Sequence, residues 1–459
     1  MIWMWLSLAN AEPTWERCYP KHVGQEAYCT EVSTPLDPEN PNGEHLELAV
    51  IQLPAIRANA ELDPVIVLAG GPGQGATETI ATLYPALRKV HQRRTLVFID
   101  QRGTGQSQPL NCELPELSNS EVPVAELQTC RHELPYEPKW YQTRHLADDT
   151  EFVRQSLGYE SINLYGVSYG TRLAMTIARR HPSSVRSMVL DGLVPFQKAI
   201  GGNFGTGFRE SLEQIFIDCS ANPECSKSFP QLREEYQKVV NELQADETKI
   251  IQHPHPRTGN MTQTEVSQDV FWGVIQQMLY SSSLSAMIPY SIHQIAEYDD
   301  WSTIIGWLDT TPFTDIPIGL YLSITCAEDA PRIDFSQAPS ANLGVASSSQ
   351  LQEMCNVWDT NPVEPDFFEP LKTAIPVLLL SGELDPVTPP EYGDLVLSTL
   401  SNAKHLVVTG AAHNTIQTPC AQRVVTEFIE MPDPQNLSKN CDDEVLRTPF
   451  ILSATGTTP

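Results

Sequence analysis

Short apolar runs alternate with helical runs at both ends of the chain. Continuous apolar runs of strand length occupy residues 64–69 and 96–99, Ile162 and Leu164 alternate as in a strand, and further strands are expected at residues 185–190, 375–380 and 405–408. Helical patterns lie among them at residues 148–157, 173–178 and 420–429. This alternation predicts an α/β protein with a doubly wound, mainly parallel sheet, in which sites gather at the carboxyl ends of the strands.

Two stretches depart from that pattern. Residues 44–53 alternate apolar and polar side chains, which predicts an antiparallel edge strand. Between residues 195 and 365 apolar positions recur at helical spacing and no strand pattern interrupts them. Amphipathic helices are expected there at residues 208–219, 231–244, 268–280 and 284–298.

We interpret the helical stretch as an inserted lid. The resulting division is a first core part at residues 12–195, a helical lid at 196–365 and a second core part at 366–459. The large aromatic residues of the lid are expected in its hydrophobic core: Trp272, Tyr280, Trp301 and Trp307.

The amino terminus and the cysteines indicate an oxidising compartment. Residues 1–11 are apolar and end in Ala-x-Ala, which is typical of the end of a signal peptide. Ten cysteines lack the spacing of a zinc site and suggest disulfides. Pairing neighbours closes the shortest loops and predicts Cys18–Cys29, Cys112–Cys130, Cys219–Cys225, Cys326–Cys355 and Cys420–Cys441. A periplasmic or secreted location follows from both features.

Composition excludes several classes of partner. The formal net charge is −28 over 459 residues, so nucleic acid is not expected to bind. With 41% hydrophobic residues the chain can bury a large core, and no later stretch has the length and apolarity of a membrane span. The number of subunits is left open.

The candidate chemistry begins at residues 161–174, a strand, a sharp turn and a helix around Gly-x-Ser-x-Gly. In a nucleophile elbow the serine sits on a strained turn, and its neighbours must be small so that strand and helix can pass closely. Gly166 and Gly170 meet that requirement around Ser168. An ordinary serine in a glycine-rich turn is the alternative.

A serine nucleophile needs a base and an acid that orients the base. Asp385 and His413 each follow a predicted strand near the end of the chain. The order serine, acid, histidine is that of an α/β-hydrolase triad, so we predict Ser168, Asp385 and His413 as catalytic. Glu383 is the competing acid, and Asp385 is preferred because it lies further into the turn.

Acyl transfer also needs hydrogen-bond donors for the developing oxyanion. The residue after the nucleophile, Tyr169, supplies one backbone N–H. The second is expected from Gly71, in Gly-Gly-Pro-Gly after an early strand, with Gly70 one position away as the alternative. Neither a metal nor a cofactor is expected.

The motifs resemble a known family. They are Gly-Gly-Pro-Gly at residues 70–73, Asp-Gln-Arg-Gly-x-Gly-x-Ser at 100–107, Gly-x-Ser-Tyr-Gly at 166–170, Asp-Pro-Val-Thr-Pro at 385–389 and Gly-x-x-His at 410–413. Together they resemble the α/β-hydrolase serine peptidases, which include prolyl aminopeptidase and the secreted bacterial tripeptidyl aminopeptidases. Cys219, Cys225 and the sequence at 324–329 are closer to the tripeptidyl branch. Ala69 stands where prolyl aminopeptidases usually carry histidine.

The resemblance implies the α/β-hydrolase fold and a short peptide substrate with a free amino terminus. In this family an acidic residue from the lid region holds that amino group. Glu328 is the nearest match, with Asp329 beside it; the alternative is a pair that caps a turn after a disulfide. Residues 320–324, before this pair, are apolar and strand-like.

Three functions remain open from the sequence. The leading prediction is a serine exopeptidase that cleaves near the amino terminus of short peptides, of tripeptidyl or prolyl type. A carboxylesterase has the same triad, because the triad does not distinguish amides from esters. Acidic groups beside Ser168 would favour the peptidase. A catalytically silent binding protein on the same fold is the third.

Overall fold

The structure is a computed structural model, and it describes residues 13–112, 122–202, 204–246, 248–255, 258–310, 316–335, 348–437, 441 and 447–457. The predicted end of a signal peptide, residues 1–11, lies outside these ranges. Within them no helix has both the length and the apolar character needed to cross a membrane.

In the described part of the chain, one sheet has nine strands in the order β1-β2-β3-β5-β4-β6-β7-β10-β11, and β8 and β9 form a separate hairpin. The strands are β1 (Glu16–Cys18), β2 (Ala27–Pro35), β3 (His45–Leu53), β4 (Val65–Leu68), β5 (Leu96–Ile99), β6 (Ile162–Val167), β7 (Val185–Asp191), β8 (Thr248–Pro254), β9 (Met261–Ser267), β10 (Val377–Gly382) and β11 (Ala403–Val408). All neighbours from β5 to β11 in this order are parallel, which confirms the predicted α/β sheet.

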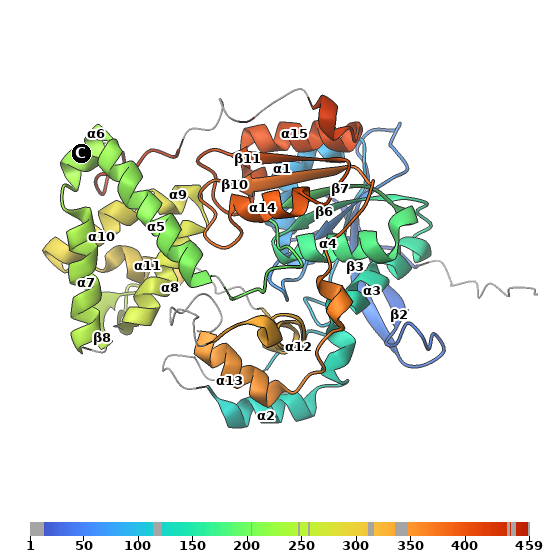
Figure 1. Ribbon diagram of the computed structural model, residues 1–459, viewed down its shortest axis with the longest axis horizontal. Coiled ribbons are helices and arrows are strands. Elements are labelled where there is room, and N and C mark those ends of the chain that lie inside the picture. Colours follow the sequence, from blue (N-terminus) through green and yellow to red (C-terminus); the bar gives the residue numbers. More distant parts are fainter. Residues whose placement is uncertain are drawn as a thin grey trace, which may run out of the picture.

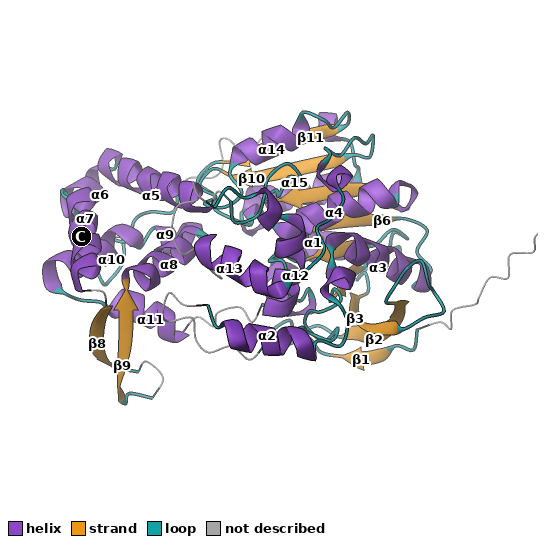
Figure 2. Cartoon of the chain, turned by 60° about the horizontal axis from the view of Figure 1, so that its bottom comes forward, coloured by secondary structure: helices purple, strands orange, loops and turns teal. Residues whose placement is uncertain are grey.

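Helices cover both faces of this sheet and fill the middle of the chain (Figures 1 and 2). They are α1 (Ile80–His91), α2 (Val124–Glu133), α3 (Thr143–Ser156), α4 (Tyr169–Arg180), α5 (Phe204–Ala221), α6 (Pro223–Ser228), α7 (Leu232–Asp246), α8 (Gln268–Leu279), α9 (Ser282–Ser285), α10 (Ile288–Tyr298), α11 (Ser302–Thr310), α12 (Ile318–Glu328), α13 (Ser348–Trp358), α14 (Pro390–Leu397) and α15 (Pro419–Glu430).

The sheet is buried on both faces because side chains alternate along each strand. On β6, Leu164 belongs to the hydrophobic cluster that includes α3 and α4. The next residue, Tyr165, belongs to the opposite cluster, which includes α1 and α15. All six residues of β6 are buried. The strand that precedes Ser168 is therefore held on both sides.

Within residues 196–365 the described helices belong to two hydrophobic clusters. Helices α5, α7, α8, α10 and α11 share one cluster, which forms the body at the left of Figure 1. Helices α12 and α13 pack with α2 in another, below the sheet in the same view. The boundaries of the lid stay a prediction, and the two clusters indicate that the segment after α11 packs separately from the lid body.

Three predictions about elements were wrong. The strand at residues 44–53 is β3, which pairs antiparallel with both β2 and β5 and so is not at an edge. The middle segment contains strands after all, the β8–β9 hairpin that projects from the lid body in Figure 2. The strand-like run at residues 320–324 lies in α12, whose residues are all buried from Gly319 to Glu328. Complete burial removes the polar face that identifies a helix.

The predicted lid helices are present, with one divided. The pattern at residues 284–298 corresponds to α9 and α10, two consecutive helices. Trp301 is 3% exposed in the lid core, and Trp272 and Trp307 pack against it, as predicted. Tyr280 was expected there too, but it lines a pocket beside Ser168.

All five predicted disulfides are present, and they use all ten cysteines. Cys441 ties the end of the chain to Cys420 in α15. Further along, Phe450 and Leu452 are buried in the lid cluster, and the backbone N–H of Ile451 donates to Ala286 O at 3.0 Å. The carboxyl-terminal segment therefore connects the sheet with the lid. Five disulfides indicate maturation in an oxidising compartment.

Candidate active site

Ser168 lies on the turn between β6 and α4 in a strained conformation. Its φ is 54° and its ψ is −124°, values that a non-glycine residue rarely adopts. A Cβ at Gly166 would lie 2.4 Å from Gly170 O, and one at Gly170 would lie 2.2 Å from Leu68 O. Both positions therefore require glycine, and the turn has the geometry of a nucleophile elbow.

Asp385 and His413 meet in the loops that follow β10 and β11. His413 Nδ1 lies 2.7 Å from Asp385 Oδ2. Asp385 is 3% exposed, and the backbone N–H groups of Val387 and Thr388 donate to its Oδ1 at 3.0 and 2.8 Å. The competing acid, Glu383, accepts instead from the backbone N–H of Gly410. The contact with His413 therefore belongs to Asp385.

The end of β7 connects the serine turn with the histidine loop. The backbone N–H of Ser168 donates to Asp191 O at 2.9 Å. The Asp191 carboxylate accepts from the hydroxyl and backbone N–H of Thr415 and from the backbone N–H of Ile416, at 2.7 to 3.0 Å. One residue therefore holds the nucleophile turn and the chain just after His413.

Sequence reasoning did not single out Asp191. It directly follows the strand predicted at residues 185–190. Its burial is complete, so its carboxylate must be satisfied internally, and the four donors come from Thr415, Ile416 and Tyr165. An acidic residue directly after the apolar residues Met188–Leu190 of a strand was the available signal.

Thr388 is a second residue that sequence reasoning missed. Its Oγ1 donates to Asp385 Oδ2 at 2.6 Å and lies 3.2 Å from His413 Nδ1. The Thr388 hydroxyl and the His413 imidazole thus contact the same oxygen of the Asp385 carboxylate. The spacing Asp-Pro-Val-Thr places it there, because the turn after Asp385 brings residue 388 back over the carboxylate.

The surroundings of His413 change its pKa in opposing directions. Burial lowers the pKa, because an imidazolium loses hydration there. The charge of Asp385 and the hydrogen bond to it outweigh that effect, and Asp191 adds to them, so the pKa lies above its ordinary value. The base form of His413 is therefore populated only above that raised value.

The predicted oxyanion donors lie around the serine. Gly71 lines the same pocket as Ser168 and has a φ of 105°. A Cβ at Gly70 would lie 3.2 Å from Ser168 Cβ, so the Gly70–Gly71 loop lies against the nucleophile. Tyr169 begins α4 directly after Ser168. Both glycines of this loop thus lie beside Ser168, where the fold would place the second backbone donor.

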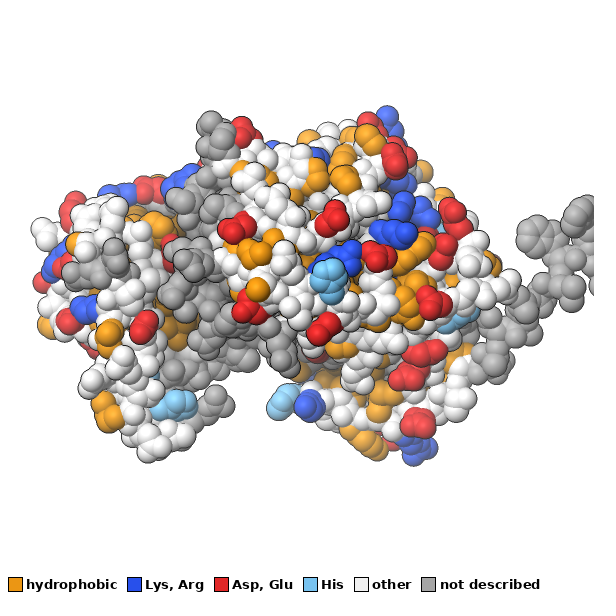
Figure 3. Space-filling view, turned by 90° about the horizontal axis from the view of Figure 1, so that it is seen from below, with side chains coloured by type: hydrophobic (Ala, Val, Ile, Leu, Met, Phe, Trp, Pro, Cys, Tyr) orange, Lys and Arg blue, Asp and Glu red, His pale blue; other side chains and the backbone are white. Residues whose placement is uncertain are grey.

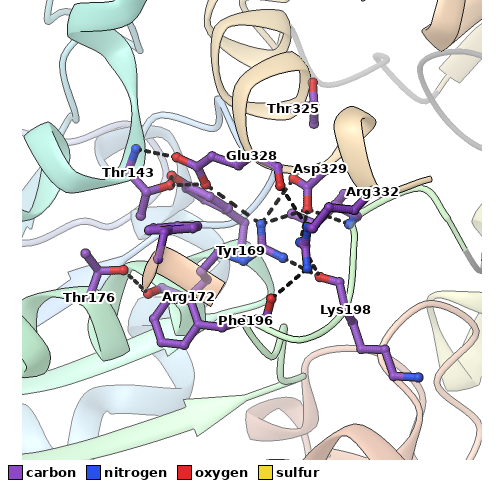
Figure 4. A network of polar contacts seen from close by, with 12 residues as sticks. Thr143, Tyr169, Arg172, Thr176, Phe196, Lys198, Thr325, Glu328, Asp329 and Arg332 are labelled. Atoms are coloured by element: carbon purple, nitrogen blue, oxygen red, sulfur yellow. Dashed lines mark hydrogen bonds and ion pairs between the residues drawn. The ribbon is translucent and has the colours of Figure 1, made fainter. Parts of the chain in front are cut away.

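Glu328 and Asp329 lie in a buried polar network rather than in the pocket (Figure 4). Glu328 Oε1 accepts from the backbone N–H of Thr143, and Oε2 accepts from the Thr143 hydroxyl, both at 2.7 Å. Asp329 Oδ1 lies 3.0 Å from Arg172 Nη1 and accepts from the backbone N–H of Ile200 at 2.8 Å. Both carboxylates are fully buried and occupied by the chain itself.

This network reaches the nucleophile helix. Thr143 Oγ1 lies 2.6 Å from the hydroxyl of Tyr169, the residue after Ser168. Since the one hydroxyl hydrogen of Thr143 goes to Glu328, the Tyr169 hydroxyl donates to Thr143. Burial raises the pKa of Glu328 to about 7, with Arg172 opposing and Asp329 adding to the rise. The contacts thus favour a positioning role for Glu328, through Thr143 and Tyr169.

The lid also contacts the histidine loop directly. The ring of Tyr280 meets the His413 ring edge to face, with centroids 5.2 Å apart. The backbone N–H of Ala412 donates to Ser282 Oγ at 3.0 Å. Tyr280 and Ser282 come from the end of α8 and the start of α9, so this part of the lid belongs to the site.

A small pocket of about 50 Å³ opens beside Ser168. Its described lining combines apolar, hydroxyl and glycine positions with a single charged residue, Lys198. Its residues are Gly71, Ser168, Val194, Lys198, Ala199, Ile200, Tyr280, Val387, Thr388 and Tyr392. Among these described residues none is a carboxylate.

Two family models match the chain. One, described as alpha/beta hydrolase fold, matches residues 63–235, which include Ser168. The other, described as TAP-like protein, matches residues 341–441, which include Asp385 and His413. The two matches thus contain the three residues that the sequence predicted as catalytic.

Curated relatives agree with these matches. Serine protease Hip1 of Mycobacterium tuberculosis is 24% identical over 457 residues, 88% of this chain and 85% of that protein. Carboxylesterase B of the same species is 30% identical over 226 residues, 43% of each chain. Tripeptidyl aminopeptidase of Streptomyces coelicolor is 25% identical over 209 residues, 40% of this chain and 39% of that protein. This chain is therefore a serine hydrolase with the α/β-hydrolase fold and a TAP-like carboxyl-terminal region, and its sequence is similar to those of a serine protease and a tripeptidyl aminopeptidase.

Proposed function

We propose that the protein is a serine exopeptidase that hydrolyses amide bonds near the free amino terminus of short peptides. Ser168 is the nucleophile, His413 the base and Asp385 the acid that orients it. The contact between His413 Nδ1 and Asp385 Oδ2 carries the proposal, because it leaves Nε2 as the nitrogen that can serve the serine.

The reaction proceeds in two halves. Ser168 Oγ attacks the carbonyl carbon while His413 Nε2 takes the hydroxyl proton. The carbonyl oxygen becomes an oxyanion that accepts hydrogen bonds from the backbone N–H groups of Tyr169 and Gly71. The C–N bond then breaks, and Nε2 gives its proton to the leaving amine. Water attacks the acyl-enzyme with His413 again as base, and the acid is released from Ser168.

Relatives support the peptidase assignment over the other hydrolases. A relative matched over most of both chains is named a serine protease, and another is named a tripeptidyl aminopeptidase. The TAP-like match covers the loops of Asp385 and His413. The extracytoplasmic environment indicated by the disulfides is consistent with a periplasmic or secreted enzyme, which we propose as its location.

The charges that line the pocket bear on how many residues the enzyme releases from the substrate in each cleavage. An enzyme that releases one residue would hold the substrate ammonium within a few bonds of Ser168. The described lining there provides Lys198 and no carboxylate, so it favours an ammonium held further away, as after removal of several residues. This supports the tripeptidyl type over the prolyl type. Whether Glu328 or Asp329 holds the ammonium stays a prediction.

A carboxylesterase is the second candidate. The absence of a carboxylate among the described lining residues is the observation in its favour, because an ester substrate needs no partner for an ammonium. A relative named carboxylesterase matches 43% of the chain.

Activity on matched substrates separates the candidates. Aminoacyl-, prolyl-, dipeptidyl- and tripeptidyl-amides of one fluorescent amine would be compared with simple acyl esters of similar size. We expect the tripeptidyl amide to have the highest kcat/KM. Ser168→Ala should remove the activity and covalent labelling by a fluorophosphonate while the circular dichroism spectrum is kept. Turnover of esters alone would replace the exopeptidase by the esterase, and an active Ser168→Ala would disprove the nucleophile.

A further inference from the structure

We propose that Lys198 selects substrates that carry a carboxylate close to the bond that is cleaved. The proposal rests on the function proposed for Ser168 and adds a substrate class to it. Lys198 lies in the loop between β7 and α5 and lines the same small pocket as Ser168, Gly71 and Thr388. It is the only charged side chain in the described lining of that pocket.

The loop that carries Lys198 is held rigidly by the buried network. Arg172 Nη2 and Arg332 Nη2 donate to Lys198 O at 2.7 and 3.3 Å, and Arg332 Nη1 donates to Phe196 O at 3.0 Å. Two residues further on, Ile200 N–H donates to Asp329. Four hydrogen bonds therefore fix the backbone on both sides of the lysine, which makes its side chain part of a built pocket.

The side chain itself points out of that network. Figure 4 shows the Lys198 carbonyl facing the two guanidinium groups and the aliphatic chain leading away from them. Its Nζ lies 5.5 Å from the centroid of the Tyr392 ring, which also lines the pocket. A ring face attracts an ammonium without using up its hydrogen-bond donors. Within the described part of the chain, no residue is seen to accept a hydrogen bond from Nζ, so its donors can serve a ligand.

No carboxylate among the described residues forms an ion pair with Lys198. A half-buried cation beside an aromatic ring, in a pocket that the serine nucleophile also lines, matches a substrate anion. The matching group is a carboxylate, the anion that peptides carry.

A peptide offers that carboxylate from two sources. One is an acidic side chain on the residue whose carbonyl is attacked. The other is the terminal carboxylate of a short leaving peptide. Either source places one negative charge close enough to Ser168 for the Lys198 side chain to reach it. Two pairs of substrates distinguish the two sources.

The first pair is a tripeptidyl amide of a fluorescent amine that ends in glutamate or in its isostere glutamine. The second is a tetrapeptide with a free or an amidated carboxyl terminus. We expect kcat/KM to favour the charged member of one pair in the unaltered enzyme. Lys198→Met should lower that preference at least tenfold, and the pair that responds identifies the source. Lys89→Met, on an exposed part of α1 outside the pocket, removes the same charge and should leave the ratio unchanged.

Three of the remaining outcomes overturn the inference, and a test on esters keeps it separate from the exopeptidase proposal. No preference for either charged member, or an equal loss on charged and neutral members in Lys198→Met, would mean that the lysine only shapes the loop. An equal change in Lys89→Met would assign the effect to net charge. If the enzyme cleaves no amide, the exopeptidase proposal fails, and the ratio is measured on succinyl and butyryl esters of one alcohol. A preference for the succinyl ester that Lys198→Met removes would then support the lysine by itself.

Discussion

At the scale of single residues, the hydroxyl of Thr388 completes the contact between Asp385 and His413. We expect Thr388→Val to lower kcat/KM about tenfold, roughly 1.4 kcal/mol of transition-state stabilisation. The reason is that Oγ1 donates to the carboxylate oxygen that orients the imidazole. Thr388→Ser keeps a hydroxyl and should recover most of the activity.

The pH profile separates this role from simple packing. Because Asp385 raises the pKa of His413, kcat/KM should fall as the pH drops through a midpoint above the ordinary histidine value. Removing the Thr388 donor leaves more of the carboxylate charge to act on the imidazolium, so Thr388→Val should move that midpoint upwards. A profile that keeps its midpoint in Thr388→Val would assign the threonine to packing alone.

At the scale of elements, α12 ends against the nucleophile helix α4. Glu328→Gln keeps an acceptor for Thr143 but loses the charge that lies 3.8 Å from Arg172. We expect kcat to fall about tenfold, roughly 1.4 kcal/mol, on a peptide amide and on an ester alike, because the carboxylate acts through Thr143 on Tyr169. Glu353→Gln, on the exposed side of α13, is the matched control.

The comparison of substrates decides between the two roles of Glu328. A loss confined to peptides with a free amino group, with KM raised, would restore the original prediction that Glu328 holds the substrate ammonium. An equal loss on both substrates with KM unchanged would support the positioning role. The measurement is kcat and KM for one free-amine peptide amide and one small acyl ester.

At the scale of the whole molecule, some disulfides join elements outside the central sheet. Cys326–Cys355 joins α12 to α13 across 29 residues, whereas Cys219–Cys225 spans only 6 in the lid. Because a longer loop restricts the unfolded chain more, replacing the first pair by serine should cost roughly 3–4 kcal/mol and the second roughly 2 kcal/mol. Denaturant unfolding of the two double variants measures the difference.

Alkylation without reduction provides the control, since the native protein should show no free thiol by mass spectrometry. The reverse order of stability would mean that strain in the folded state, rather than the unfolded chain, determines the effect. On the face seen in Figure 3, acidic and basic side chains are interspersed rather than gathered into a patch.

Local sequence patterns were sufficient to predict those features of the structure that are determined by residues close together in the chain. The apolar strands, the Gly166–Gly170 turn and the five disulfides follow from runs, motifs and short loops. Asp385 and His413 could be chosen because strand ends in a parallel sheet meet at one edge. The structure places these two side chains in contact.

Tertiary packing decided what the local pattern left undetermined. A fully apolar run is compatible with a strand or with a buried helix, and only its neighbours made residues 318–328 a helix. Likewise a carboxylate can face a ligand or the interior, and burial against Thr143 gave Glu328 an internal partner. Tyr280 and Asp191 joined the site for the same reason. Their contacts come from segments more than a hundred residues away, and no local pattern encodes such contacts.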